Sequence, residues 1–183
     1  MIFARVGTTD TATYEMYPEC VPADSVLEQE FGERFNKFAL LKARTSIKEL
    51  SGGLTNRNFL IETPGDKYVA RVSSNSSSFL AIDRGSEFIN TTIAGKGGVG
   101  AQVLDYIPGE GLLLISYISG KTFGAKDVGA NLPRIATSLR NLHALKPFDH
   151  EFNMFHTQSN YLKIVQEQGF RVPDGYVDFE PMV

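Results

Sequence analysis

A glycine-containing hexapeptide, Ser51-Gly52-Gly53-Leu54-Thr55-Asn56, is the strongest chemical signal in the chain. Paired glycines let a backbone approach a ligand closely, and exposed amides in such a loop can bind phosphate oxygens. Thr55 and Asn56 add side-chain donors. Paired glycines are also common in ordinary hairpin turns, so the loop alone leaves both interpretations open.

A basic and an acidic residue farther along the chain have the chemistry to complete a phosphate site. Arg71 lies inside the apolar run 68–72, and Glu87 lies in a segment with helical spacing. A carboxylate on such a helix can pair with the guanidinium and hold it toward a nucleotide phosphate. Structural ion pairs are common, so the pair gains its weight from the glycine loop that precedes it.

Two other segments imitate known motifs and fail on context. Residues 95–100 spell G-x-G-x-x-G, but a dinucleotide site needs a strand before the loop and a helix after it. Here a helix precedes the segment and a strand follows, which predicts a helix end and a turn. Gly120-Lys121-Thr122 ends like a P-loop, yet the first glycine of that motif would fall on Ile115.

The three histidines, His143, His150 and His156, show neither a nucleophile partner nor zinc-ligand spacing on a helix. His143 falls at the end of an apolar helix and is predicted to be a buried structural residue. The single cysteine, Cys20, can form no internal disulfide and cannot alone build a zinc site.

Apolar patterns place the candidate residues on a β-β-β-α-β-β unit. The predicted strands are 46–50, 58–63, 67–72, 102–107 and 112–118, and a helix over 83–94 separates the third strand from the fourth. An earlier helical pattern runs from Asp24 to Leu41. Beyond Gly120 the spacing predicts a buried helix over 131–145 and a short one over 161–168.

Composition narrows the classes of function. The chain has 183 residues, a net charge of −3 and 21% charged residues, enough for one domain or one lobe. This balance gives no electrostatic footprint for nucleic acid and no polybasic patch for a membrane. No apolar run reaches the roughly 20 residues that span a bilayer, and the N-terminus does not resemble a secretory signal. A cytoplasmic protein without nucleic-acid or membrane partners is the expectation.

Several motifs, taken in order, resemble the N-terminal portion of the choline/ethanolamine kinase family. They are Leu50–Asn56, Tyr68–Val72, Ile82-Asp83-Arg84 followed by Glu87, Leu113–Gly120, and the helix with Leu139–His143, which together extend the likeness over residues 46–160. This family is grouped with the aminoglycoside phosphotransferases and has a protein-kinase-like fold of two lobes. The resemblance implies an α+β fold, with a five-stranded antiparallel sheet and one helix in the N-lobe and an incomplete helical C-lobe after it.

The same resemblance implies a division of the chain into three parts. Residues 1–45 would form an irregular segment and a helix, residues 46–119 the nucleotide-binding N-lobe, and residues 120–183 the hinge and the truncated start of the C-lobe.

The resemblance also implies a role for each candidate residue. The Ser51–Asn56 loop would close over the ATP phosphates, and Arg71 would bind the α- and β-phosphates with Glu87 as its helix partner. Ser116 and Ile118 would present backbone carbonyl and amide groups to the adenine at the hinge. The implied activity is transfer of the γ-phosphate of MgATP to a small alcohol, with choline or ethanolamine as the expected substrate.

The chain departs from the family at the catalytic loop, which reads His-x-Asp followed by an asparagine. No histidine here is followed two residues later by aspartate. Asp178 is a weak candidate for the later metal-binding aspartate, because no catalytic loop precedes it. No catalytic residue is therefore assigned, the Mg²⁺ ligands are expected in a part of the C-lobe that this sequence lacks, and the chain alone is expected to be inactive.

Two further functions stay open from the sequence. One is a non-catalytic nucleotide-binding, regulatory or degenerate kinase-like protein, and the other is a sister kinase that acts on aminoglycosides or another alcohol. A truncated second lobe would also leave apolar helix faces uncovered, so self-association through that region is expected.

Overall fold

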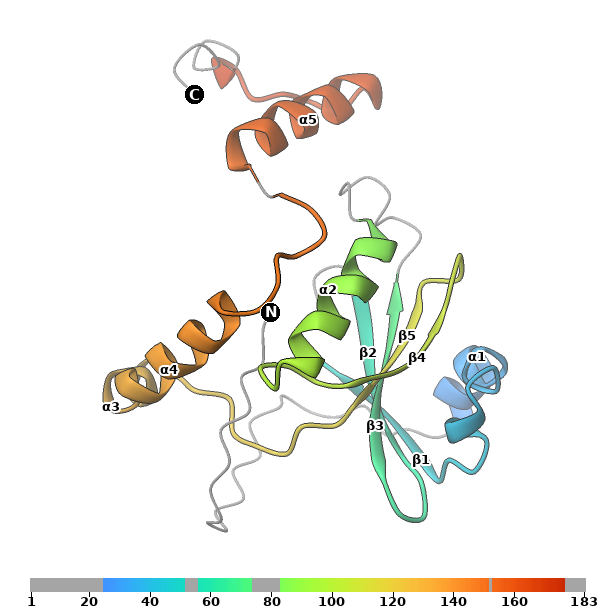
Figure 1. Ribbon diagram of the computed structural model, residues 1–183. Helices are drawn as coiled ribbons and strands as arrows, with labels where there is room; N and C mark the ends of the chain where they lie inside the picture. The colour runs from blue at the N-terminus through green and yellow to red at the C-terminus, as the bar shows by residue number, and fades with distance from the viewer. Residues whose placement is uncertain (1–24, 52–55, 74–82, 152, 177–183) are drawn as a thin grey trace.

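A five-stranded antiparallel sheet lies between two of the helices (Figure 1). The computed structural model describes residues 25–51, 56–73, 83–151 and 153–176. The strands are β1 Ser46–Leu50, β2 Asn56–Glu62, β3 Lys67–Ser73, β4 Val103–Ile107 and β5 Leu112–Ser116, and their order in the sheet is β1-β2-β3-β5-β4. The predicted order of strands and helix is confirmed, with the ends of the strands displaced by up to two residues.

One face of the sheet is closed by the helix α1, Ser25–Phe35. Phe59 of β2 lies in an aromatic cluster, 4.6 Å from Phe31 and 5.4 Å from Phe35 between ring centroids. The helical pattern predicted to run to residue 41 covers two elements, because α1 ends at Phe35 and a 3-10 turn follows at Ala39–Leu41. The buried residues of this core are Leu27, Phe31, Phe35, Phe38, Leu41, Ile47, Phe59, Ile61, Ala70, Val72, Leu112 and Leu114.

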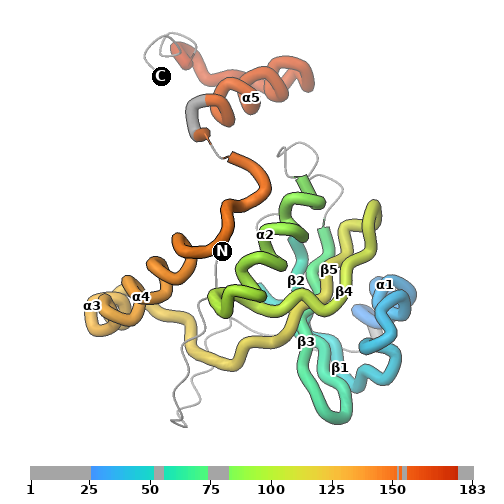
Figure 2. The backbone as a smooth tube through the Cα atoms, in the orientation of Figure 1, coloured from blue at the N-terminus to red at the C-terminus, as the bar shows by residue number. Residues whose placement is uncertain are grey.

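The helix α2, Arg84–Lys96, lies against the other face of the sheet (Figure 2). Successive side chains of a strand point to opposite faces, so Ala70 and Val72 enter the α1 core while Arg71 faces α2. The ring of Phe88 on α2 stacks on Tyr106 of β4, with centroids 4.5 Å apart and planes at 11°. This stack holds α2 against the same face of the sheet from which Arg71 projects.

The end of α2 explains the glycine-rich segment 95–100. A Cβ atom on Gly95 would lie 2.5 Å from the backbone oxygen of Ala101, so only glycine lets the chain return this close to the helix. Gly97 caps the helix and Gly98 has a φ of 72°, a left-handed conformation that glycine adopts without strain. The segment is a helix end and a turn, as its context predicts.

In the described residues after β5 there are three helices: α3 Ala125–Ala130, α4 Leu132–His143 and α5 Met154–Glu167. The predicted burial of the helix over 131–145 is wrong, because α4 contains no buried residue and Leu132 is 57% exposed. The predicted burial of His143 is also wrong, because this residue is exposed at the end of α4.

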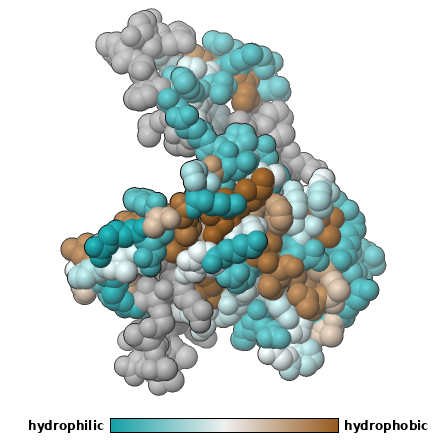
Figure 3. Space-filling view, viewed as in Figure 1, coloured by the Kyte–Doolittle hydropathy of each residue, from teal (hydrophilic) through white to brown (hydrophobic). Residues whose placement is uncertain are grey.

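The remaining differences concern the extent of these helices. α3 was not predicted, and α5 begins at Met154 rather than at Tyr161. Large apolar side chains are exposed on these helices. The face of the molecule drawn in Figure 3 has apolar surface over this helical region and at its centre. Among the described helices, none is long and apolar enough to cross a membrane.

Candidate functional site

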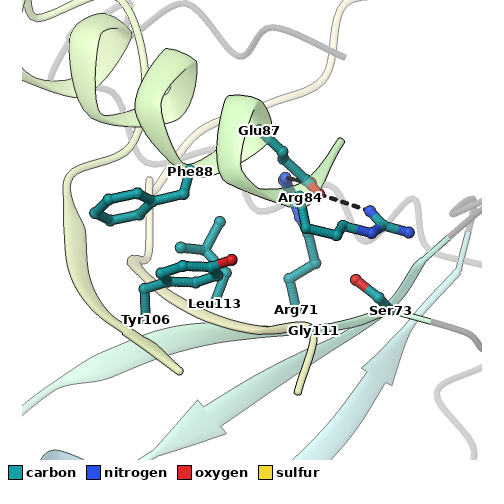
Figure 4. A pocket seen from close by; sticks show the side chains of 8 residues that line it. All are labelled: Arg71, Ser73, Arg84, Glu87, Phe88, Tyr106, Gly111 and Leu113. Atoms are coloured by element: carbon teal, nitrogen blue, oxygen red, sulfur yellow. Dashed lines mark hydrogen bonds and ion pairs between the residues drawn. The ribbon is translucent and has the colours of Figure 1, made fainter. Parts of the chain in front are cut away.

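Two arginines and one glutamate meet between α2 and the sheet (Figure 4). β3 presents Arg71 on the α2 side. The carboxylate of Asp83 accepts a hydrogen bond of 3.0 Å from the Ser86 amide and caps the N-terminus of α2, which places Arg84 and Glu87 in its first turn. The site is therefore built where the first turn of a capped helix crosses the middle strand of the sheet.

Both carboxylate oxygens of Glu87 are hydrogen-bonded to guanidinium groups. Nη1 of Arg71 donates to Oε1 at 2.6 Å, and Nη1 of Arg84 donates to Oε2 at 2.6 Å. Burial by itself raises the pKa of Glu87, but the hydrogen bonds from Arg84 and Arg71 outweigh it, so the pKa lies below its ordinary value. Two cations against one anion leave the cluster with a net positive charge, which suits a phosphate.

Two asparagines of β2 form hydrogen bonds with the cluster of Arg71, Arg84 and Glu87. Asn58 lies opposite Arg71 in the register of β2 and β3, and its Oδ1 accepts from Nε of Arg71 at 3.3 Å. Nδ2 of Asn56 donates to Oε1 of Glu87 at 3.3 Å. Asn56 is the last residue of the glycine-containing hexapeptide, so the end of that loop is tied directly to the ion pair.

The cluster borders a cavity of about 10 Å³, which has room for about one water molecule. Its lining residues are Arg71, Ser73, Arg84, Glu87, Phe88, Tyr106, Gly111 and Leu113. Within the described part of the chain, Nη2 of Arg84 and Oδ1 of Asn56 are buried without a hydrogen-bond partner. A buried guanidinium nitrogen that lacks an acceptor fits a site for an anionic oxygen.

The two hinge candidates lie where the chain leaves the sheet. Ser116 ends β5 opposite Tyr68; its amide donates to the oxygen of Gln102 at 2.8 Å, and its hydroxyl accepts from the amide of Gln102 at 2.9 Å. The strand predicted to reach residue 118 ends at Ser116, so half-buried Ile118 follows it in the connection toward α3.

The structure therefore brings Arg71, Glu87 and Asn56 together and places Ser51, exposed, at the end of the hairpin strand β1. The other predicted residues, Gly52, Gly53, Leu54, Thr55 and Asp178, lie outside the described residues. Over the parts of the chain that the structure describes, no group of three or more His, Cys, Asp or Glu side chains could hold a metal ion.

Two site residues were not predicted. The three-residue spacing of Arg84 and Glu87 on one helix face is a signal that could have identified Arg84. Asn58 gives no such signal, because its place opposite Arg71 depends on the pairing of β2 with β3.

Comparison with known proteins identifies the family. Residues 46–173 match the model of the phosphotransferase enzyme family. The chain belongs to this family. No sequence among the curated proteins matches it.

Solved structures similar to this phosphotransferase-family chain include a choline/ethanolamine kinase family protein, a choline kinase and an ethanolamine kinase. A choline/ethanolamine kinase family protein from Mesorhizobium loti is 25% identical with a TM-score of 0.64, over 85% of this chain and 51% of the other. The choline kinase LicA from Streptococcus pneumoniae is 21% identical with a TM-score of 0.69, over 86% and 54%. A Plasmodium vivax ethanolamine kinase is 13% identical with a TM-score of 0.57, over 86% and 46%.

These matches confirm two predictions. The resemblance to the choline/ethanolamine kinase family over its N-terminal portion is confirmed, and so is the α+β fold with a five-stranded antiparallel sheet followed by helices. The chain spans about half the length of the solved structures that it matches. A structure of LicA in complex with AMP is also similar, with a TM-score of 0.60.

Proposed function

We propose that this member of the phosphotransferase family carries the nucleotide-binding part of an ATP-dependent kinase, which transfers the γ-phosphate of MgATP to the hydroxyl of a small alcohol. Choline and ethanolamine are the expected substrates, since the similar structures include kinases of both. The observation that carries the proposal is the ion pair of Arg71 and Glu87, on the two elements where the family resemblance expects a phosphate-binding pair.

The residues around the ion pair fit the phosphates of ATP. Arg71 would bind the α- and β-phosphates, and Nη2 of Arg84 offers a further buried donor without a described partner. The Ser51–Asn56 loop would cover the phosphates, with Asn56 holding its end against Glu87. Ser116 and Ile118 would offer backbone groups to the adenine at the exit from the sheet.

Within this arrangement Glu87 acts as a positioning residue. Its carboxylate is ionised and both oxygens are occupied by guanidinium groups, so it is not placed to take a proton from an alcohol. It holds Arg71 in one orientation, and the positive charge of the cluster would stabilise the phosphate oxygens of the nucleotide. Mg²⁺, when bound with ATP, neutralises phosphate charge, and we assign no ligand for it among the described residues.

A second candidate is a kinase-like protein that binds the nucleotide without catalysis. It is favoured by one sequence observation, the lack of a His-x-Asp motif in the chain. Both candidates require ATP binding, and they differ in turnover. Formation of ADP that depends on choline, ethanolamine or another alcohol favours the kinase and overturns the binding protein.

The test is a thermal-shift titration of the chain with MgATP, beside Arg71→Ala and a matched control, Arg57→Ala. Arg57 also lies in the sheet and pairs with glutamates, but its guanidinium lies over the Phe31 ring on the α1 face. ATP is expected to raise the Tm of the wild type and of Arg57→Ala, and to leave that of Arg71→Ala unchanged. A folded wild type without a shift overturns the ATP site, and an equal shift in Arg71→Ala overturns the role of Arg71.

A further inference from the structure

A second group of polar contacts on α2 joins the helix to a distant part of the chain. The hydroxyl of Ser86 donates to Oδ2 of Asp149 at 2.7 Å, across 63 residues of sequence. The backbone N–H of Asp149 donates to Oδ1 of Asn90 at 2.7 Å. Asp149 lies between α4 and α5, so these bonds connect the helix that carries Glu87 with the helical region after the sheet.

His150 completes this cluster without making it a catalytic triad. Its Nδ1 lies 2.8 Å from the Ser86 hydroxyl oxygen and 2.9 Å from Oδ2 of Asp149. A hydroxyl has one hydrogen, which Ser86 gives to Asp149, so Nδ1 of His150 carries a hydrogen and is the donor to both. In a hydrolytic triad the serine and the carboxylate bind different ring nitrogens, whereas here they share one. The cluster therefore fastens two segments and activates no nucleophile.

The same segment also contacts the other end of α2. A Cβ atom on Gly97 would overlap the side chain of Leu145, so Leu145 packs directly on the helix end. Ser86, Asn90 and Gly97 lie within about 40° of one another around the helix and extend over about 16 Å of its length. Residues 145–150, which we call the strap, thus run along one stripe of α2 from its C-terminal end to its first turn (Figure 2).

We propose that the strap positions Glu87: Asp149, through Ser86 and Asn90, holds the first turn of α2 where Glu87 meets Arg71. The inference rests on the proposed function, in which that ion pair orients Arg71 toward ATP. Ser86 directly precedes Glu87, so a rotation of the helix that moved one would move the other. The Phe88–Tyr106 stack anchors α2 to the sheet on a different stripe, and the strap fixes the helix against rotation about that anchor.

The proposal is tested first by nucleotide affinity. Asp149→Ala and Asn90→Ala each remove a bond between the strap and α2, and Asn141→Ala, at an exposed position of α4, is the matched control. Each strap variant is expected to bind MgATP about fivefold more weakly in calorimetric titration, the effect of about one hydrogen bond. The control is expected to match the wild type. Asp149→Asn keeps an acceptor for the Ser86 hydroxyl and is expected to recover part of the loss.

A double variant separates positioning from a general loss of structure. If the strap acts through Glu87, Asp149→Ala adds no further loss of affinity in a Glu87→Gln background. Equal losses with and without Glu87, or unchanged affinity in both folded strap variants, overturn the proposal while leaving ATP binding by Arg71 intact.

Hydrogen exchange without nucleotide gives a readout that does not depend on the proposed function. The amides of residues 87–91 are expected to exchange faster in Asp149→Ala and Asn90→Ala, with exchange in β2 and β3 unchanged. If the wild type binds no ATP, the proposed function fails, and hydrogen exchange alone then tests whether the strap holds α2 in place. Faster exchange confined to α2 then supports it, and unchanged exchange overturns it.

Discussion

Arg71 of β3 and Glu87 of α2 face each other across the space between sheet and helix, with Nη1 of the arginine 2.6 Å from Oε1 of the glutamate. Each side chain is about one-fifth exposed. The second carboxylate oxygen is bound by Arg84, so one glutamate holds two arginines in place. This relationship joins the sheet, the helix and the end of the glycine loop in one site, and its removal is the most direct test of how the site is held.

Glu87→Gln is expected to lower the free energy of unfolding by about 2 kcal/mol, because two neighbouring guanidinium groups lose their shared counter-charge. Urea denaturation of the two proteins measures the difference. Glu30→Gln is the control, since Glu30 is 50% exposed and its partner Arg57 keeps a second bond to Glu49. Glu30→Gln is expected to lower the free energy of unfolding by less than about 0.5 kcal/mol. Equal losses would show that the pair at Glu87 is no stronger than a surface pair.

The same carboxylate makes stability depend on pH. Because the pKa of Glu87 is lower in the folded chain than its ordinary value of 4.5, its contribution is complete above that value. The contribution falls as the pH drops below 4.5 and the folded carboxyl takes up a proton. The Tm difference between wild type and Glu87→Gln, followed from pH 7 to pH 3, is therefore expected to shrink in acid. A difference that stays constant or grows contradicts the lowered pKa.

Gly95→Ala tests the close contact between α2 and the chain that enters β4. The new Cβ would lie 2.5 Å from a backbone oxygen of Ala101, which cannot move aside as a side-chain end can. A loss of about 2 kcal/mol in the free energy of unfolding is expected from this overpacking. Gly65→Ala, with no atom within 4 Å of its new Cβ, is expected to be neutral. Similar values for the two variants would show that the helix end moves away without cost.

The sequence predicts those parts of the site that depend on local patterns. An arginine inside an apolar run and a glutamate in a segment with helical spacing predict the Arg71–Glu87 pair, and the structure forms it. The bond between Ser86 and Asp149 has no such pattern, because it joins residues that only the folded chain brings together. The apolar spacing of α4 likewise identifies a face of the helix, but the spacing does not determine whether anything covers that face.

The apolar face of α4 is expected to make the chain self-associate. Leu132 and Leu139 are 57% and 48% exposed, and their seven-residue spacing places them on one side of the helix. Covering such side chains releases water from apolar surface, so a second copy of the chain is a favourable partner at high concentration.

Sedimentation velocity is expected to show an apparent mass that rises with concentration, and a Leu132→Lys/Leu139→Lys variant is expected to stay monomeric with an unchanged Tm. Val26→Lys, at a 69% exposed apolar position on α1, is the matched control and is expected to associate like the wild type. A wild type that stays monomeric at every concentration contradicts the expectation, and association that survives in the double-lysine variant assigns the contact to another surface.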